Sequence, residues 1–461
     1  MLLLLVGLEV LSAARDADAA GFATARFGGE HGHVTTTNPT ALYYNPAGLG
    51  FSSGIHLFLD GTLAMRRVLW DHPPAATDPL GPPGADGADY GRAAAFNVFG
   101  APMFGASARF GNFAAGLAFY VPFGGRVRWS RNDHVANSAE FPLATDGVQR
   151  WHTIEGALTF LSATAGVAYR LGALSLGATF NLYRSSIKST RARNPNGQGL
   201  PDSTREGRTT LDVNGIQASF GAGVMLEAVP ERLWFGLSYQ AQPGLGPMKL
   251  SGTLTTEYRG PWPQTAAEST PTQTQFPVTM HQALPDIVRL GARYRIVREW
   301  ELRLSVDWTR WGVLQTQCVA IENYPCAVTR SGADAGGGGV QQNLRRYWND
   351  TYGIHAGGSH WLKPEIELFA GIGFETSAAP DRTLDPELPD ASTFSGAGGV
   401  RVGLGKKFFL AASYTHIQSL VRNNVGKSEL ADAEYPTPRP DGGGIYHQWI
   451  GVLNANAQKE F

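Results

Sequence analysis

The sequence predicts an all-β fold: a transmembrane antiparallel β-barrel of about 14 strands with a small N-terminal plug (hatch) in its lumen. Three observations predict it. Segments whose apolar residues recur at every second position run through most of the chain. Short connections alternate with long polar ones, as the turns and loops of bacterial outer-membrane barrels do. An irregular apolar segment precedes the first strand and needs a surrounding wall to satisfy its backbone groups.

Composition supports one continuous β structure. The chain has 461 residues, of which 57 are glycine and 11% are aromatic, and both values are high for a protein of average composition. Length alone suggests several globular domains, but these residues are spread evenly from start to finish. The formal net charge of -1 excludes a broad basic surface, so we expect no nucleic-acid partner.

The first residues predict a signal peptide over residues 1–19. An apolar run at positions 2–8 precedes Ala17-Asp18-Ala19, which has the small-x-small spacing of a cleavage site. The usual Lys or Arg before the run is missing, which a start codon assigned too far downstream or a weak signal would explain. A buried helix is the alternative, but charged residues follow the run directly. We therefore expect export, and the barrel pattern places the protein in the bacterial outer membrane.

Residues 20–50 form the predicted plug, and residues 51–461 form the predicted barrel. Within the plug, the stretch 41–50 is unsuited to a strand because Pro46 lacks a backbone donor and Gly48 loosens the chain. A barrel of this strand number has a lumen that a small domain can fill. The plug side chains expected to face a partly apolar interior are Phe22, Phe27, Leu42, Tyr43, Tyr44 and Leu49.

The barrel strands are expected at 53–70, 92–104, 111–125, 156–170, 173–189, 211–229, 233–256, 285–297, 300–312, 351–362, 365–376, 394–404, 406–418 and 445–461. Long polar connections at 71–91, 126–155, 313–350 and 419–444 alternate with short ones such as Lys363-Pro364. A soluble sandwich would also show alternating strands, but it does not require this asymmetry of connections. An even strand number closes the sheet without an edge.

The last strand ends on Phe461. An aromatic residue at the end of an alternating final strand is typical of the signal that the barrel assembly machinery reads. Lys459 on the apolar face departs from this pattern, although at a strand end it can snorkel to the interface. An ordinary carboxyl-terminal strand is the alternative interpretation.

These features together resemble the FadL-type long-chain fatty-acid transporters of Gram-negative outer membranes, which include relatives that take up toluene and other hydrocarbons. The resemblance covers essentially the whole mature chain. Four stretches carry it: Ala20-Gly21-Phe22, Asn45-Pro46-Ala47 in the plug, Tyr120-Val121-Pro122-Phe123-Gly124 and the terminal Phe461. Asn-Pro-Ala alone is weak, but Asn-Pro-Ala-Gly-Leu before the first strand of a barrel is much more specific.

The resemblance implies passive uptake of long-chain fatty acids or other hydrophobic small molecules. Substrate would be captured among the extracellular loops, move to an apolar site above the plug and leave sideways through a kink in the third strand. By this resemblance Phe22 would reach the inner site, and Asn45, Pro46 and Ala47 would lie beside the wall opening. The plug residues proposed to contact substrate are Phe22, Phe27, Leu42, Tyr44 and Leu49.

The third strand has a local reason to open. Pro122 cannot donate to the sheet ladder, and Gly124 and Gly125 follow closely, so pairing should fail here. The alternative is that Pro122 merely ends the strand. The kink could also lie earlier, near Gly116.

Charged residues are expected to face the lumen from two adjacent strands. Arg289, Arg293 and Arg295 share a predicted face with Glu301, Arg303 and Asp307. One arginine could bind the carboxylate of a fatty acid, but we favour an ion-pair network that braces the wall.

Cys318 and Cys326 are expected to form a disulfide within one extracellular loop, since two thiols without a nearby histidine make a poor zinc site. His31 and His33 have only Glu30 nearby, so we expect no metal site. No phosphate-binding loop occurs in the sequence and nothing in it singles out a catalytic nucleophile with its base, so we expect neither a cofactor nor an enzyme.

The alternatives that remain are a general diffusion porin and a loop-displaying adhesin or receptor barrel. An outer-membrane lipase would need a matched Ser and His facing lipid, and the sequence singles out no such pair. The expected partners are a hydrophobic small molecule, outer-membrane lipid and the assembly machinery, with the protein as a monomer. The sequence does not choose between fatty acid, alkane, aromatic hydrocarbon and terpenoid.

Overall fold

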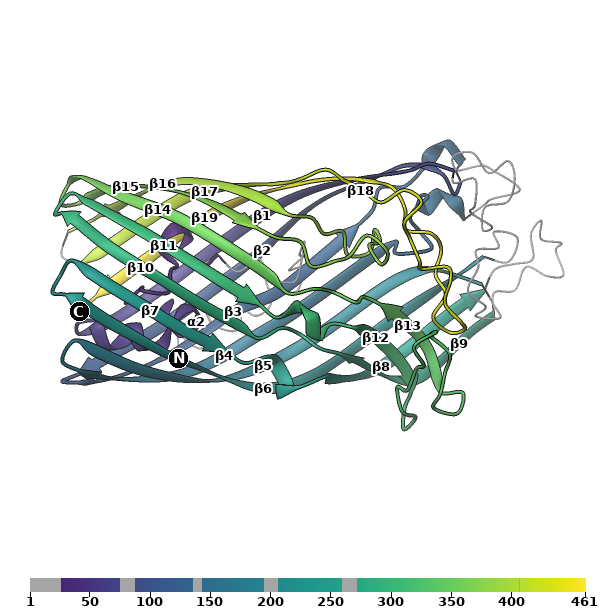
Figure 1. Cartoon of the computed structure of the whole chain (residues 1–461), viewed down its shortest axis with the longest axis horizontal. Coiled ribbons are helices and arrows are strands. Elements are labelled where there is room, and N and C mark those ends of the chain that lie inside the picture. Colours follow the sequence, from purple (N-terminus) through teal and green to yellow (C-terminus); the bar gives the residue numbers. More distant parts are fainter. Residues whose placement is uncertain (1–25, 75–87, 136–142, 195–205, 259–271, 406) are drawn as a thin grey trace.

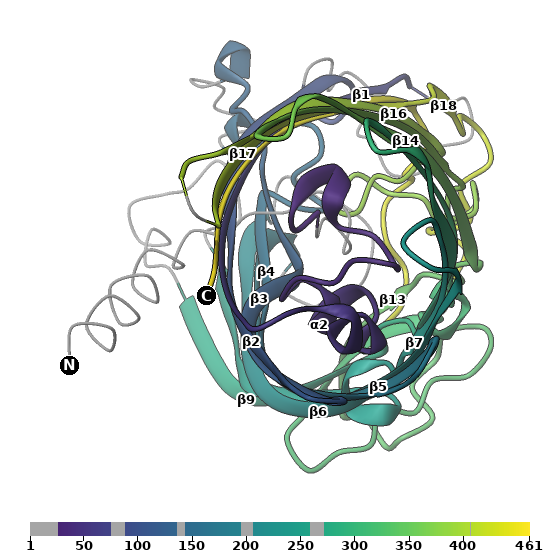
Figure 2. The same cartoon turned by 90° about the vertical axis from the view of Figure 1, so that its left-hand side faces the viewer.

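The computed structural model of the chain describes residues 26–74, 88–135, 143–194, 206–258, 272–405 and 407–461 (Figure 1). Its strands form one sheet that closes on itself, because β1 (Ile55–His72) pairs antiparallel with β2 (Gly91–Phe110) and with β19 (Ile445–Glu460). Figure 2 looks along the resulting barrel. The predicted 14-strand antiparallel barrel is confirmed. The predicted signal peptide and Phe22 lie outside the described residues.

Two ends of the barrel are distinguished by their connections (Figure 1). The turn end has short connections, such as the one from β4 to β5, and the loop end has the long ones. The other strands are β3 (Phe113–Arg128), β4 (Glu155–Leu171), β5 (Leu174–Arg193), β6 (Gly207–Val229), β7 (Leu233–Gln240), β8 (Met248–Tyr258), β9 (Thr272–Gln282), β10 (Ile287–Val297), β11 (Trp300–Thr309), β12 (Thr316–Ile321), β13 (Val340–Arg345), β14 (Thr351–Lys363), β15 (Ile366–Glu375), β16 (Thr393–Gly403), β17 (Phe408–Ser419) and β18 (Arg422–Asn423). The helical turns are η2 (Gly29–His31), α2 (Ala41–Tyr44), η3 (Pro46–Phe51), η4 (Asp133–Val135), η5 (Ala144–Asp146), η7 (Pro243–Leu245) and η8 (Trp311–Val313).

Several barrel strands are broken in two, which the predicted boundaries missed. The expected strand 233–256 is interrupted by η7, where Gly244 has a φ of 83°. β9, β12 and β13 lie in segments that were expected to be loops. Both errors lie toward the loop end, where the pattern of apolar residues changes.

Apolar side chains change sides along the strands. In β5, Leu176 and Phe180 are exposed on the outer face, whereas Ile187, closer to the loop end, is buried inside. β6 repeats this, with Phe220 outside and Leu211 inside. The inward cluster at the loop end comprises Ile187, Leu211, Val213, Leu250, Leu254, Val278, Met280 and Val319. The turn-end half of the barrel therefore presents an apolar belt outward, and the loop-end half encloses an apolar interior.

The described plug residues lie inside the barrel, toward its turn end, where Figure 2 shows α2 within the ring of strands. Phe27, Leu42 and Leu49 are fully buried and pack with Phe58 of β1 and Tyr120 of β3. Among the described residues no helix is long and apolar enough to cross a membrane.

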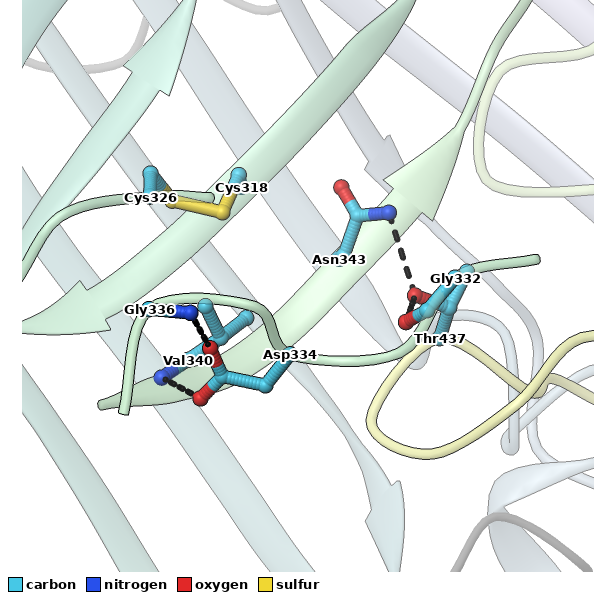
Figure 3. Close-up of a disulfide and its surroundings, with 8 residues drawn as sticks. All are labelled: Cys318, Cys326, Gly332, Asp334, Gly336, Val340, Asn343 and Thr437. Carbon is cyan, nitrogen blue, oxygen red and sulfur yellow. Dashed lines mark hydrogen bonds between the residues drawn. A yellow bond between two sulfur atoms is a disulfide. The ribbon is translucent and has the colours of Figure 1, made fainter. Parts of the chain in front are cut away.

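A disulfide joins Cys318 in β12 to Cys326, as expected (Figure 3). Thr437 connects this region to the next long loop, because its Oγ1 donates to the carbonyl oxygen of Gly332 and accepts from Nδ2 of Asn343. Two segments far apart in the sequence are thus joined at the loop end.

Candidate functional site

The ladder between β2 and β3 is interrupted over part of its length, and this unpaired stretch of the wall is called the opening below. Their register runs from Phe110 opposite Phe113 to Met103 opposite Tyr120 and then stops. β2 nevertheless stays paired with β1 as far as Gly91, and β3 stays paired with β4 beyond a register shift after Tyr120. Residues 123–127 of β3 therefore have a ladder partner on one side only, and Val121 and Pro122 have none in either register.

Contacts between the two strands resume above this stretch. Ala95 and Trp129 form an isolated bridge, and the N–H of Arg128 donates to Oδ1 of Asn97 at 2.9 Å. The opening is thus bounded by Tyr120 toward the turn end and by Arg128 toward the loop end.

Two prolines explain why pairing stops here. Pro122 of β3 and Pro102 of β2 both lack the N–H that a ladder bond requires. Pro102 lies immediately past the last regular pair, and Pro122 lies two residues past it, within the register shift against β4. β3 continues to Arg128, so Pro122 does not end the strand. Sequence reasoning selected Pro122 but overlooked Pro102, although a proline inside an alternating segment is a readable signal.

The other kink candidates differ in role. Gly116 is paired regularly with Ser107 and Gly166, so the strand does not kink there. A Cβ at this position would lie 3.2 Å from Cδ1 of Leu42, so its small size serves plug packing. Gly124 lies in the stretch without a β2 partner.

A cavity of 220 Å³ in the lumen meets this opening, since Gly124, Gly125 and Val127 of β3 contribute to its wall. Its apolar lining includes Leu158, Ile187, Met280, Leu344, Ile417 and Ile450. The sequence analysis did not identify these residues. The readable signal for them was that apolar residues switch from one face of a strand to the other toward its loop end.

Of the plug side chains expected to contact substrate, the described ones, Phe27, Leu42, Tyr44 and Leu49, do not line this cavity. Phe27 packs edge-on against Tyr43 and Tyr120, with ring centroids 5.3 and 5.2 Å apart. Leu42 and Leu49 belong to the same buried cluster. Arg26 is the described plug residue that reaches the cavity.

Tyr44 lines a second cavity, of 190 Å³, between the plug and the charged side of the barrel. The two cavities share Arg26, Trp311, Thr351 and Glu375 in their linings. The lumen thus contains an apolar chamber toward the loop end and a polar one beside the plug.

The Asn-Pro-Ala motif lies away from the opening, contrary to expectation. Nδ2 of Asn45 donates to the carbonyl oxygens of Val34 and of Val224 in β6, at 2.9 and 3.0 Å. A Cβ on Gly223 would collide with Oδ1 of Asn45, so this close approach needs glycine. The motif therefore anchors the plug to β5–β7, on a different wall from the open seam.

The predicted lumenal charges brace the plug and the wall. Arg289 stacks over the ring of Tyr43 at 4.6 Å and donates to its carbonyl oxygen, and Arg303 donates to the carbonyl oxygen of Glu30 at 3.1 Å. The remaining contacts are Arg295 with Glu301 at 3.2 Å, Asp307 with His355 at 3.3 Å and Arg293 over Trp234 at 4.2 Å.

The two plug histidines are also held by the wall. Nε2 of His31 lies 2.8 Å from Oε1 of Glu367, and burial lowers the pKa of His31. His33 contacts Thr35 and the carbonyl oxygen of Leu304, and burial lowers its pKa to about 3. The described residues contain no group of three potential metal ligands.

The terminal Phe461 donates its N–H to the carbonyl oxygen of Ile55 at 2.9 Å, and its side chain is exposed. Its role in assembly stays a prediction.

Comparison with known proteins gives concordant results. A family model described as "Outer membrane protein transport protein (OMPP1/FadL/TodX)" matches residues 12–429. An outer membrane protein of Neisseria meningitidis serogroup B is 22% identical over 423 residues, covering 88% of this chain and 84% of that protein.

Solved structures share the fold. A Pseudomonas aeruginosa FadL homologue superposes with a TM-score of 0.73 at 16% identity, covering 97% of this chain and 98% of its own. The Pseudomonas putida toluene transporter TodX superposes with a TM-score of 0.63 at 14% identity, and the match covers 98% of this chain and 97% of TodX. The Ralstonia pickettii toluene transporter TbuX superposes with a TM-score of 0.60 at 15% identity, and the match covers 97% of each chain.

Proposed function

The chain belongs to the outer membrane protein transport family OMPP1/FadL/TodX, and on this premise we propose that it takes up long-chain fatty acids or other hydrophobic small molecules passively and releases them sideways. The family membership makes it an outer-membrane transporter of hydrophobic compounds and not an enzyme. The substrate and the lateral route are the parts we propose.

The observation that carries the proposal is the meeting of the apolar cavity with the open β2–β3 seam. Opening a fully paired seam would require breaking ladder hydrogen bonds, and a polar group left unpaired in lipid is costly. Here Pro102 and Pro122 have no such N–H to lose. An apolar molecule in the cavity can therefore reach the wall at its weakest place.

The plug supports this route over a straight passage. The buried cluster around Phe27, Leu42 and Tyr120 lies inside the barrel toward its turn end. A general diffusion porin needs an open aqueous lumen, so a plug packed into the lumen argues against that function. We accordingly propose residues 1–19 as signal peptide, 20–50 as plug and 51–461 as barrel.

Restoring the ladder donors tests the route. We expect the P102V/P122V variant to take up radiolabelled oleate and hexadecane at least several-fold more slowly than wild type, at matched surface expression. P277V is the matched control, because Pro277 lies in β9, regularly paired with Thr253 and away from the opening. Heat-modifiable gel migration should show that all variants assemble. Unchanged uptake in the double variant would mean that substrate leaves elsewhere.

A further inference from the structure

Two exposed arginines lie on the outer face of the barrel, at the loop-end edge of its apolar belt. On β1 the outward positions from Ile55 to Met65 carry no charge, and Arg67 is the first outward residue that does. On β3, Arg128 follows the buried Val127, and 69% of its side chain is exposed. Both guanidinium groups therefore lie where the apolar belt ends and the lipid headgroups begin.

An aromatic residue separates the two arginines. Arg67 is opposite Phe96 on β2 and opposite Trp449 on β19. Arg128 lies on the other side of Phe96, because the isolated bridge above the opening places these two residues side by side. The rings of Phe96 and Trp449 have their centroids 6.4 Å apart, and aromatic side chains of barrels concentrate at headgroup level. Arg67, Phe96 and Arg128 are called the basic row below.

The positive charge of the basic row is only weakly compensated. Arg67 makes no ion pair with any described residue. Arg128 approaches Glu155 at 3.8 Å, and because both side chains are exposed this pair contributes little. Asp71, the next outward acid on β1, is held by two hydrogen bonds from Arg92 at 2.6 and 3.0 Å. The basic row thus presents net positive charge to the membrane.

The basic row lies at the loop-end edge of the opening, because contacts between β2 and β3 resume at Arg128. Two outward positions at the opening, Gly100 and Gly124, have no side chain. Gly100 pairs with the exposed Leu63, and Gly124 shares the outward face of β3 with Arg128. A lipid held at the basic row would extend its acyl chains toward the turn end, across these two glycines.

We propose that the basic row binds the phosphate of an anionic lipid in the outer leaflet, and that the acyl chains of this lipid cover the opening. Guanidinium groups bind phosphate through pairs of N–H donors. Neighbouring strands are about 5 Å apart, so two arginines separated by one strand are about 10 Å apart and can reach one headgroup over Phe96. Basic side chains beside an apolar belt attract anionic headgroups. The assignment concerns a lipid partner and holds whatever cargo the barrel carries.

Quenching by brominated lipids tests this site. The native cysteines form a disulfide, so the thiol of a G100C variant can be labelled selectively with a fluorophore at the opening. A Cβ at this position meets only the carbonyl oxygen of Thr62, at 3.7 Å, so the barrel should accept the change. The labelled full chain in phosphatidylcholine nanodiscs is titrated with phosphatidic acid or phosphatidylcholine that carry the same brominated acyl chains.

Phosphatidic acid should quench the label at a mole fraction at least threefold lower than phosphatidylcholine. Adding R67Q/R128Q should abolish this preference, and adding R67K/R128K should retain most of it. R184Q is the matched control, because Arg184 is an exposed arginine on the outward face of β5, between Leu161 and Ile216 and away from the opening. It should leave the preference unchanged.

Three results would overturn the proposal. Equal quenching by both lipids without any arginine substitution would refute the site directly. An unchanged preference in R67Q/R128Q would refute the assignment to the basic row, and an equal loss in R184Q would reduce it to a general effect of surface charge. Oleate and hexadecane uptake by the same variants separates this site from transport. Normal uptake without a lipid preference removes the lipid site alone, whereas no uptake of any apolar compound removes the transport function.

Discussion

Two seams of this barrel, β2–β3 and β5–β6, show how a closed sheet can contain an exit. β5 and β6 are paired without interruption from Leu174 opposite Leu226 to Arg193 opposite Gly207. β2 and β3 are paired only up to Met103 opposite Tyr120. The strands are of similar length, but only the open seam contains prolines. The difference shows that a wall can be weakened locally by removing donors while the rest of the sheet stays closed.

The difference between the two seams matters for transport only if the plug blocks a straight passage through the lumen. Deletion of residues 26–50 removes the buried cluster around Phe27 and Leu42 and should convert a barrel of low conductance into an open pore, with single-channel current raised at least tenfold. Planar-bilayer recording checks this. Large steady currents in the wild type would make the seam irrelevant to passage.

A smaller effect is expected from loosening the plug on the side of the closed seam. The G223V variant places a side chain against Asn45 and should weaken plug docking by about 1–3 kcal/mol, the usual cost of overpacking. Limited proteolysis of the plug in intact barrels measures it. G396V is the control, since a Cβ there meets nothing within 4 Å. Equal protection in both variants would show that the motif does not anchor the plug.

The disulfide is expected to act locally and to leave both seams unchanged. The C318S/C326S variant opens a loop with a sequence separation of 8, which removes about 2.5 kcal/mol in the chain-entropy estimate. Hydrogen exchange should become faster in β12 and β13 only. Faster exchange in β2 or β3 would show that the disulfide-bonded region also stabilises the strands beside the opening. The difference between the two seams would then not be explained by the prolines alone.

Acid should weaken the plug by a modest amount through His33. Its folded pKa of about 3 lies below the ordinary 6.5, so the unfolded state binds more protons between these values and stability falls as pH decreases through that window. Burial is the main cause, with Arg303, Arg293 and His355 opposing the charged form. At pH 5.5 the cost is about 1.4 kcal/mol. Plug proteolysis should rise between pH 7 and 5.5 in wild type and stay flatter in H33Q.

The sequence predicted the strands that cross the apolar belt because alternation there is strict, as between Leu302 and Val306. It failed where a strand leaves that belt, because residues such as Ile187 and Leu211 turn their apolar side chains inward. It also identified Pro122 but placed Asn45 beside it. No local pattern shows which wall a plug residue contacts, since Gly223 is nearly 180 residues away in the chain.

Reversible cross-linking of the two seams tests the central claim most directly. Cysteines at Gly100 and Gly124, on either side of the opening, would be joined by a cleavable bifunctional thiol reagent, and cysteines at Lys188 and Asp212 would join the closed seam, where these residues are paired. Oleate uptake should fall to background when β2 and β3 are linked and return on cleavage, with wild type treated identically as the reagent control. The link between β5 and β6 should change nothing. Wild-type uptake through a linked β2–β3 seam would contradict release through the wall.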